Sequence, residues 1–208
     1  MVCGRNSIGM ERRVRGRSLS ALCQHSVVVG LMLLGGAFAS RAGDTNDLAA
    51  ITQDYQTKAQ FLLSFAKFVE WPTNAPGGAS RLCIGIMGTG RIPGIITNEL
   101  AGKRVGDKVI ETKLCKTRDD LKHCAMIFIT RAKAGRMEDL QKAVTNAPVL
   151  TVGEFDRFIE LGGCINFVRK GEHTRLEVNL GATERGGLKV SSKLSSMTIS
   201  IRGKEDGQ

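Results

Sequence analysis

Apolar residues fall in short runs, and the first long run has the spacing of a helix. It extends from Tyr55 to Val69 and is followed by Pro72, which disfavours helical conformation in the residue before it. Four polar residues form a narrow strip at helical spacing: Gln56, Gln60, Ser64 and Lys67. Because nearly every other position of the run is apolar, we predict a helix that is covered on more than one side.

The rest of the chain alternates between strand signals and helix signals. We predict buried strands over 82–87, 108–115, 124–130 and 147–152, because each is a short apolar run. Helices are predicted over 91–102, 117–123, 135–146 and 153–163. Pro93 stands in the first turn of the first of these helices, and Thr117 is the predicted N-cap of the second.

The last part of the domain breaks this alternation. Strands at 164–168 and 174–180 are separated by a short turn that contains Gly171, which predicts an antiparallel hairpin. A final helix is predicted over 190–197. Together these elements predict one α/β domain with a mostly parallel sheet, of strand order 2-1-3-4 plus the hairpin. It would hold about six strands, flanked by about five helices.

The N-terminal segment has the three parts of a secretory signal. Basic residues between Arg12 and Arg17 precede an apolar run, 27–39, which ends in small residues. We predict a signal peptide over 1–42, with cleavage near Ala39 or Ala42, and hence a periplasmic protein. The alternative is an uncleaved anchor, but the run is shorter than the ~20 residues of a membrane span. A polar leader over 43–54, a domain over 55–201 and a polar tail over 202–208 would follow.

Removal of this segment changes the charge of the protein. The whole chain has a formal net charge of +10, and the segment 1–42 contains six arginines and one glutamate, so cleavage halves that charge. Charges of both signs are mixed along the remainder, as on an ordinary protein surface. No basic run contains interleaved aromatic residues, and we therefore do not expect nucleic-acid binding.

Four cysteines remain after cleavage: Cys83, Cys115, Cys124 and Cys164. In an oxidising compartment an even number favours disulfides, and four cysteines allow three pairings. None of their spacings is the C-x-x-C of zinc or thioredoxin-like sites, so we predict neither a metal nor another cofactor.

Catalytic patterns are weak throughout the chain. Gly88, Gly90 and Gly94 are spaced one residue too long for a dinucleotide-binding loop. No G-x-S-x-G motif is present, and only His123 and His173 could serve as bases near neutral pH outside the signal segment. We therefore predict that the protein is not an enzyme.

An ordered set of segments resembles the YfiR-like family of periplasmic proteins. The segments run from "AQFLLSFAKFVEWP" through "LCIGIMG", "HCAMIFIT" and "PVLTVGEFDRFIELGGCINFV" to "TRLEVNL" and "GLKVSSKL". The resemblance implies a regulator without catalytic activity that binds the periplasmic sensor domain of an inner-membrane diguanylate cyclase. By inhibiting that enzyme, such a regulator lowers cyclic-di-GMP and biofilm formation. The resemblance also implies an outer-membrane OmpA-like lipoprotein as a second partner.

The family resemblance further implies particular residues. A disulfide of the family falls on Cys83 and Cys124, whereas Cys115 and Cys164 have no partner in the family pattern. The first helix and the residues after it carry a second apolar face that would be covered by a further helix, a second copy of the chain or a partner. As candidate partner-binding residues we take the aromatic ones: Phe61, Phe65, Phe68 and Trp71.

A rival hypothesis from another functional class is a periplasmic module that binds a small ligand. Ligands of parallel α/β sheets bind at the carboxyl ends of the strands, which here lie near Gly88 and Thr130.

Export is the first testable prediction. N-terminal sequencing of the protein from the periplasmic fraction should begin between Ser40 and Gly43, because the small residues that a signal peptidase reads lie just before this point. A mature chain that still contains residues 27–39 would contradict it.

Overall fold

The computed structural model describes residues 42–78, 80–171, 173–195 and 198–202. The predicted signal peptide, apart from its last residue, and the end of the predicted tail lie outside this range. The chain divides into two units, 1–45 and 46–208, and apart from the first residues of α1 the following description concerns the second.

The first helix, α1, spans Ala42–Phe68 and so begins well before the predicted Tyr55. The polar residues before Tyr55 continue the helix because their side chains bond within it: Thr52 Oγ1 donates to the Leu48 carbonyl, and Lys58 pairs with Asp54 at 2.7 Å. After Phe68 the chain passes through a short strand, β1 (Val69–Glu70), to Pro72.

The four predicted parallel strands are present in the predicted order. They are β2 (Arg81–Met87), β4 (Lys108–Leu114), β5 (Met126–Ile129) and β6 (Leu150–Gly153), which lie side by side as β4-β2-β5-β6. The predicted hairpin is confirmed as well. Its strands, β7 (Ile165–Lys170) and β8 (His173–Asn179), pair antiparallel, and β7 joins β6 in parallel.

Both edges of the sheet carry strands that the sequence pattern did not predict. β3 (Arg104–Val105) pairs antiparallel with β4, and β10 (Thr198–Arg202) pairs parallel with β8. Within the described residues the main sheet thus has eight strands, in the order β10-β8-β7-β6-β5-β2-β4-β3.

The helix predicted over 190–197 is present as α6 (Ser192–Ser195) but begins two residues later than predicted, and residues 196–197 lie outside the described range. Lys189–Val190 instead forms β9, which pairs with β1 in a small second sheet. The backbone of this stretch bonds to the end of α1, where Ser191 N–H donates to the Phe68 carbonyl at 2.9 Å. Tertiary pairing has therefore replaced the helical bonds that the sequence spacing favoured.

The remaining helices connect the strands. They are α2 (Ile92–Leu100), α3 (Arg118–Leu121), the 3-10 helix η1 (Arg131–Arg136), α4 (Met137–Val144) and α5 (Leu180–Arg185). Thr117 caps α3 as predicted, in a capping box with Asp120. At α5 the side chain of Asn179 caps by accepting a bond from the Ala182 N–H at 3.0 Å.

The helix predicted over 153–163 is also wrong. This segment is a series of turns in which Arg157 has a φ of 64°, a left-handed conformation that a helix cannot contain. Phe155, Phe158 and Ile159 have helical spacing and are buried, but they enter the core from a loop. The Phe158 ring occupies the space beside Gly153 and Gly163, and a side chain at either glycine would overlap it.

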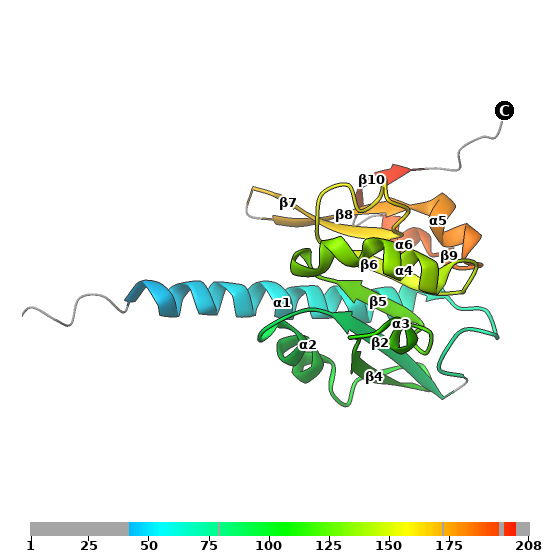
Figure 1. Ribbon diagram of the computed structural model, residues 1–208, viewed down its shortest axis with the longest axis horizontal. Helices are drawn as coiled ribbons and strands as arrows, with labels where there is room; N and C mark the ends of the chain where they lie inside the picture. Colours follow the sequence, from blue (N-terminus) through cyan, green and yellow to red (C-terminus); the bar gives the residue numbers. More distant parts are fainter. Residues whose placement is uncertain (1–41, 79, 172, 196–197, 203–208) are drawn as a thin grey trace, which may run out of the picture. The chain divides into compact units, whose positions relative to one another are not determined.

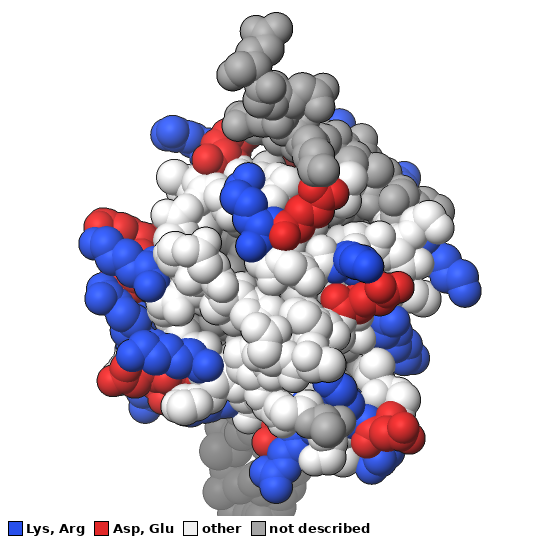
Figure 2. All heavy atoms as spheres, turned by 90° about the vertical axis from the view of Figure 1, so that its right-hand side faces the viewer, with Lys and Arg blue, Asp and Glu red and all other residues white. Residues whose placement is uncertain are grey.

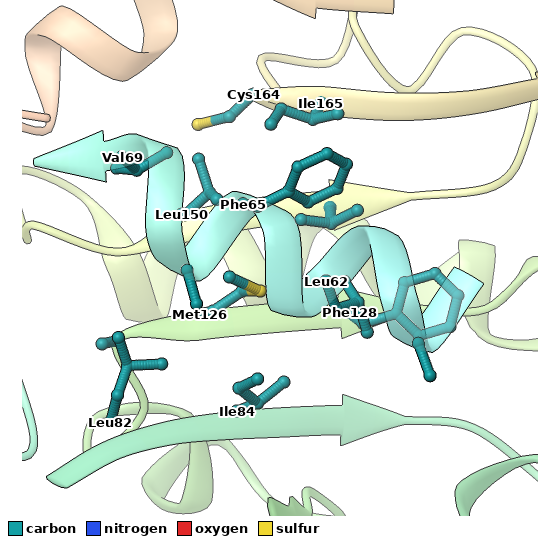
Figure 3. Close-up of a cluster of buried hydrophobic side chains, with 14 of the residues drawn as sticks. Leu62, Phe65, Val69, Leu82, Ile84, Met126, Phe128, Leu150, Cys164 and Ile165 are labelled. Atoms are coloured by element: carbon teal, nitrogen blue, oxygen red, sulfur yellow. The ribbon is translucent and has the colours of Figure 1, made fainter. Parts of the chain in front are cut away.

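Two apolar clusters lie on the two faces of the sheet. On one face α1 crosses the strands, and Figure 3 shows Leu62, Phe65 and Val69 directed from it into the cluster that holds Phe128 and Ile165. The other face is covered by α3, α4 and the loop with Phe158. Figure 1 shows α1 as the long helix that runs alongside the central strands. As predicted, α1 is apolar over most of its circumference while Gln56, Gln60 and Lys67 remain exposed.

The contact between Phe158 and the glycines gives a test of this loop. Gly163→Ala should lower the free energy of unfolding by about 1–3 kcal/mol, because the added methyl group overpacks the Phe158 ring. The matched control is Gly94→Ala in α2, where a methyl group meets no atom within 4 Å. The control should be neutral or stabilise by up to about 1 kcal/mol. Urea denaturation measures both, and equal midpoints would contradict the loop packing.

Candidate functional site

A buried charged cluster joins α1 to the carboxyl end of the sheet. Glu154, the residue that follows β6, is 6 % exposed, and three donors bond its carboxylate. Lys58 Nζ and the Tyr55 hydroxyl from α1 each donate to it at 2.7 Å, and the Arg131 backbone N–H donates at 3.0 Å. Lys58 also pairs with Asp54 at 2.7 Å. The Glu154 carboxylate therefore has three hydrogen-bond donors, which offset the cost of burying its charge.

The environment of this cluster acts strongly on its tyrosine. Burial raises the pKa of Tyr55 far above its ordinary value of 10, and the negative charge of Glu154 and its hydrogen bond add to the effect. The Lys58 ammonium lies 4.5 Å from the centroid of the Tyr55 ring, at cation–π distance. The tyrosine hydroxyl is therefore held as a donor to Glu154, which suits a structural or binding role and not that of a base.

A cavity of about 240 Å³ opens beside the cluster. Its walls come from α1, from the residues after β5 and β6, and from the hairpin β7–β8. The polar and charged lining residues are Asp54, Tyr55, Lys58, Arg131, Glu154, Arg169 and Thr174, and Phe167 supplies an apolar wall. Since Lys58 is already paired, the groups available to an incoming anion are the guanidinium groups of Arg131 and Arg169. Arg131 has only a long ion pair, 3.9 Å, to the exposed Asp156.

The positions at which a ligand site was predicted, Gly88 and Thr130, serve packing instead. Thr130 is fully buried, and its hydroxyl donates to the Met87 carbonyl at 3.1 Å. A side chain at Gly88 would crowd Pro93 and the Thr130 methyl group. The cavity begins one residue further along the chain, at Arg131, and its lining includes neither Gly88 nor Thr130.

The four predicted partner-binding residues have different surroundings. Phe65 is fully buried and stacks on Phe167 at 5.8 Å between ring centroids, so it belongs to the core. Phe61 is partly exposed and meets Phe167 edge-on at 5.7 Å. Phe68 and Trp71 are partly exposed at the end of α1, where the Trp71 indole N–H donates weakly to the Ala66 carbonyl at 3.4 Å.

The surface near that end of the molecule has an uneven charge distribution. β1, just after α1, pairs with β9, and β9 lies on the right-hand side of Figure 1. Figure 2 shows an uncharged area in the middle of this side, with charged residues of both signs directly above it, to its right and at the left edge. Such an arrangement is typical of protein interfaces, in which charged residues are depleted at the centre and form the rim.

Three of the four cysteines meet on the opposite face of the sheet from α1. The Sγ atoms of Cys83 and Cys124 are 3.3 Å apart, and those of Cys115 and Cys124 are 3.9 Å apart. Gly85 makes this possible, because a side chain there would fill the space of both the Cys115 and Cys124 sulfurs. The predicted Cys83–Cys124 disulfide remains a prediction, since both residues are thiols in this structure. The fourth, Cys164, is buried in the cluster under α1.

The thiols influence one another through these contacts. Hydrogen bonding with the Cys124 sulfur lowers the pKa of Cys83 and of Cys115, against the opposing effect of burial. The same bonds, together with burial, raise the pKa of Cys124. Among the described residues, no group of three Cys, His, Asp or Glu side chains is arranged to hold a metal ion.

Sequence reasoning did not identify the charged cluster. The helix predicted over 153–163 includes Glu154, and the polar strip predicted for the first helix does not include Lys58. One available signal was the position of Glu154 itself, an acidic residue that directly follows a mostly apolar strand. Another was Lys58, which stands on the apolar side of α1, away from the polar strip of Gln56 and Gln60.

Comparison with known proteins adds a family and a fold. Residues 55–198 match the sequence model of the family described as YfiR/HmsC-like, which spans more than half of the 208 residues. No curated protein matches the chain. Within the part of the chain that the structure describes, no helix is both long and apolar enough to cross a membrane.

Two solved structures match part of the chain. A conserved domain protein from Vibrio cholerae O1 biovar El Tor matches with a TM-score of 0.52 and 10% identity, over 71% of this chain and 60% of that one. This chain therefore spans less than two thirds of that relative. The ABC domain in complex with L-Trp from Streptococcus pneumonia matches with a TM-score of 0.42 and 8% identity, over 58% of this chain and 55% of that one. At 10% identity the first match shows similarity of fold and nothing about function. The TM-score of the second match is too low for any inference.

The charged cluster predicts an unusual titration of Tyr55, the only tyrosine of the chain. Absorbance at 295 nm should show no tyrosinate in the folded protein near pH 10, where a free tyrosine is half ionised. Because the folded pKa is raised, Tyr55 contributes its full stabilisation below about pH 10 and loses it as the pH rises further. The urea-unfolded chain is the control and should titrate near 10. A folded protein that titrates there as well would contradict the buried hydrogen bond to Glu154.

Proposed function

Because the chain belongs to the YfiR/HmsC-like family, a family of periplasmic regulatory proteins, we propose that it regulates a membrane signalling enzyme through protein–protein contact. The regulated enzyme is a diguanylate cyclase of the inner membrane, and the contact is with its periplasmic sensor domain. Binding inhibits the cyclase, so the protein lowers cyclic-di-GMP and biofilm formation. The family match over 55–198 is the observation that carries this proposal.

The surface at the end of α1 supports a binding function. Phe68 and Trp71 are partly exposed there, and aromatic side chains of this kind contribute much of the binding energy at interfaces. Phe61 and Phe65 contribute indirectly, since their packing on Phe167 fixes the position of the helix. We therefore assign direct contact with the cyclase to Phe68 and Trp71, and support of the surface to the two other phenylalanines.

Two further partners complete the proposal. An outer-membrane OmpA-like lipoprotein would relieve the inhibition by binding the regulator in place of the cyclase. A second copy of the chain is the other candidate partner, and it would bind the uncharged area shown in Figure 2. Both compete for the surface of Phe68 and Trp71, so the amount of regulator free to bind the cyclase would determine the output.

A second candidate function is the binding of a small ligand. The observation that favours it is the cavity of about 240 Å³ at the carboxyl end of the sheet, with Arg131 and Arg169 in its lining. The two guanidinium groups suit a small anion, and Phe167 suits an apolar part of the same molecule. This function is compatible with the first, because the cavity wall includes α1, whose other end carries Phe68.

Deletion of the gene tests the regulatory proposal. Cyclic-di-GMP and biofilm should both rise in the deletion strain, and the wild-type gene should restore them. A copy with Trp71→Ala should fail to restore them, because it removes an interface anchor whose truncation typically costs about 2 kcal/mol or more of binding free energy. The measurements are cyclic-di-GMP by mass spectrometry and biofilm by surface staining.

The matched control is Ile51→Ala, which truncates an apolar side chain of α1 that is 47 % exposed and lies away from the end of the helix. It should restore both readouts. Each variant must show the thermal unfolding midpoint of a folded domain before its result is used. Unchanged cyclic-di-GMP on deletion, in cells that express the candidate cyclase, would contradict the proposal.

A further inference from the structure

The arrangement of the three thiols raises a question that the proposed regulatory function does not address. Cys124 lies between two possible disulfide partners, with Cys83 at 3.3 Å and Cys115 at 3.9 Å between Sγ atoms. A sulfur can hold only one disulfide at a time, so one of the two outer thiols is always left over. The side chain that would separate the sulfurs is missing at Gly85.

We propose that Cys124 is a shared thiol that exchanges its disulfide partner between Cys83 and Cys115. The first bond, Cys83–Cys124, forms by oxidation with an external disulfide, which takes up two electrons and two protons from the two thiols and becomes two thiols itself. Exchange then needs no further oxidant. The Cys115 thiolate attacks the Cys124 sulfur, a Cys115–Cys124 bond forms, and the Cys83–Cys124 bond breaks with its electron pair on Cys83.

The proton balance of the exchange is neutral. Cys115 gives up its proton before attack, and the departing Cys83 thiolate takes one up from solvent. Lys113 is the cation near both outer thiols, and its charge favours the thiolate form of each. Two carboxylates oppose this effect of Lys113. Asp120, which pairs with Lys113 at 2.9 Å, disfavours the Cys115 thiolate, and Glu111 disfavours the Cys83 thiolate.

The two isomers differ in what they expose. Cys115 is buried, 4 % exposed, so the Cys83–Cys124 isomer holds its free thiol inside the protein. Cys83 is half-buried and lines a surface cavity of about 480 Å³ whose charged lining residues are Arg81, Glu111 and Lys113. Arg81 pairs with Glu111 at 3.3 Å, so the cavity holds charges of both signs. Exchange therefore moves the free thiol from the interior to a surface cavity, where Cys83 becomes a modification site for small disulfides such as oxidised glutathione.

Alkylation without reductant tests the exchange. The purified chain is oxidised with oxidised glutathione, freed of small molecules and incubated at pH 8 with N-ethylmaleimide. In wild type, Cys83 should become labelled progressively and the Cys115–Cys124 peptide should accumulate, because each labelled Cys83 removes one molecule from the exchange. In Cys115→Ser the Cys83–Cys124 bond has no attacking thiol, so labelling of Cys83 should be at least about tenfold slower.

Cys164→Ala is the matched control, since Cys164 lies in the separate cluster under α1, and it should behave as wild type. Peptide mapping under non-reducing, acidic conditions assigns each bond. Equal, slow labelling of Cys83 in wild type and in Cys115→Ser would overturn the proposal. So would a wild-type protein in which Cys115 is never found bonded to Cys124. The wild-type mapping needs no variant, so the proposal stays testable even if Cys115→Ser fails to fold.

Discussion

The packing of α1 across the sheet is the contact on which the rest of the structure depends. Phe61 and Phe65 of this helix meet Phe167 of the hairpin, and Phe167 in turn meets Phe128 of the central strand β5 at 6.0 Å. One group of rings thereby connects the first helix, the middle of the parallel sheet and its antiparallel part. Aromatic pairs in such arrangements contribute about 0.5–1.5 kcal/mol each beyond the burial of their area. The position of α1 then fixes both features proposed to be functional: its Lys58 and Tyr55 meet Glu154 at the carboxyl end of the strands, and the proposed partner surface consists of Phe68 at its end and Trp71 just after β1.

The cavity and the proposed partner surface share one helix. A ligand beside Arg131 would change the electrostatic surroundings of Glu154, to which α1 is bound through two side chains. These side chains, Tyr55 and Lys58, stand in the middle of the helix that ends at Phe68. The buried Lys58–Glu154 pair is a poor source of net stability, since burial of both charges offsets their attraction. Because the pair joins α1 to the end of β6, its role is better explained as fixing the position of the helix on the sheet.

The sequence allowed the central architecture to be predicted, because local patterns and one topological rule determine it. Short apolar runs separated by helix signals, together with right-handed crossovers, lead to the order of β4, β2, β5 and β6. The loop at 153–163 escaped prediction because Phe155, Phe158 and Ile159 have helical spacing while the backbone turns at Arg157. The pairing of β10 with β8 joins distant segments, and no local pattern encodes it. The cluster around Glu154 likewise depends on residues almost a hundred positions apart. Family resemblance indicated the pairing of Cys83 with Cys124. That Cys115 also lies close to Cys124 depends on the space beside Gly85, which only the structure shows.

The central claim is that the end of α1 contacts a membrane signalling protein, and site-directed photo-crosslinking in living cells tests it most directly. A photoreactive residue in place of the exposed Glu70, beside Trp71, should give an adduct with an inner-membrane protein that has a periplasmic sensor domain. The same residue in place of Asn98, exposed on α2, should give no such adduct. Adducts of equal yield at both positions, or the absence of any membrane-protein adduct at position 70 in a folded and exported chain, would contradict the account.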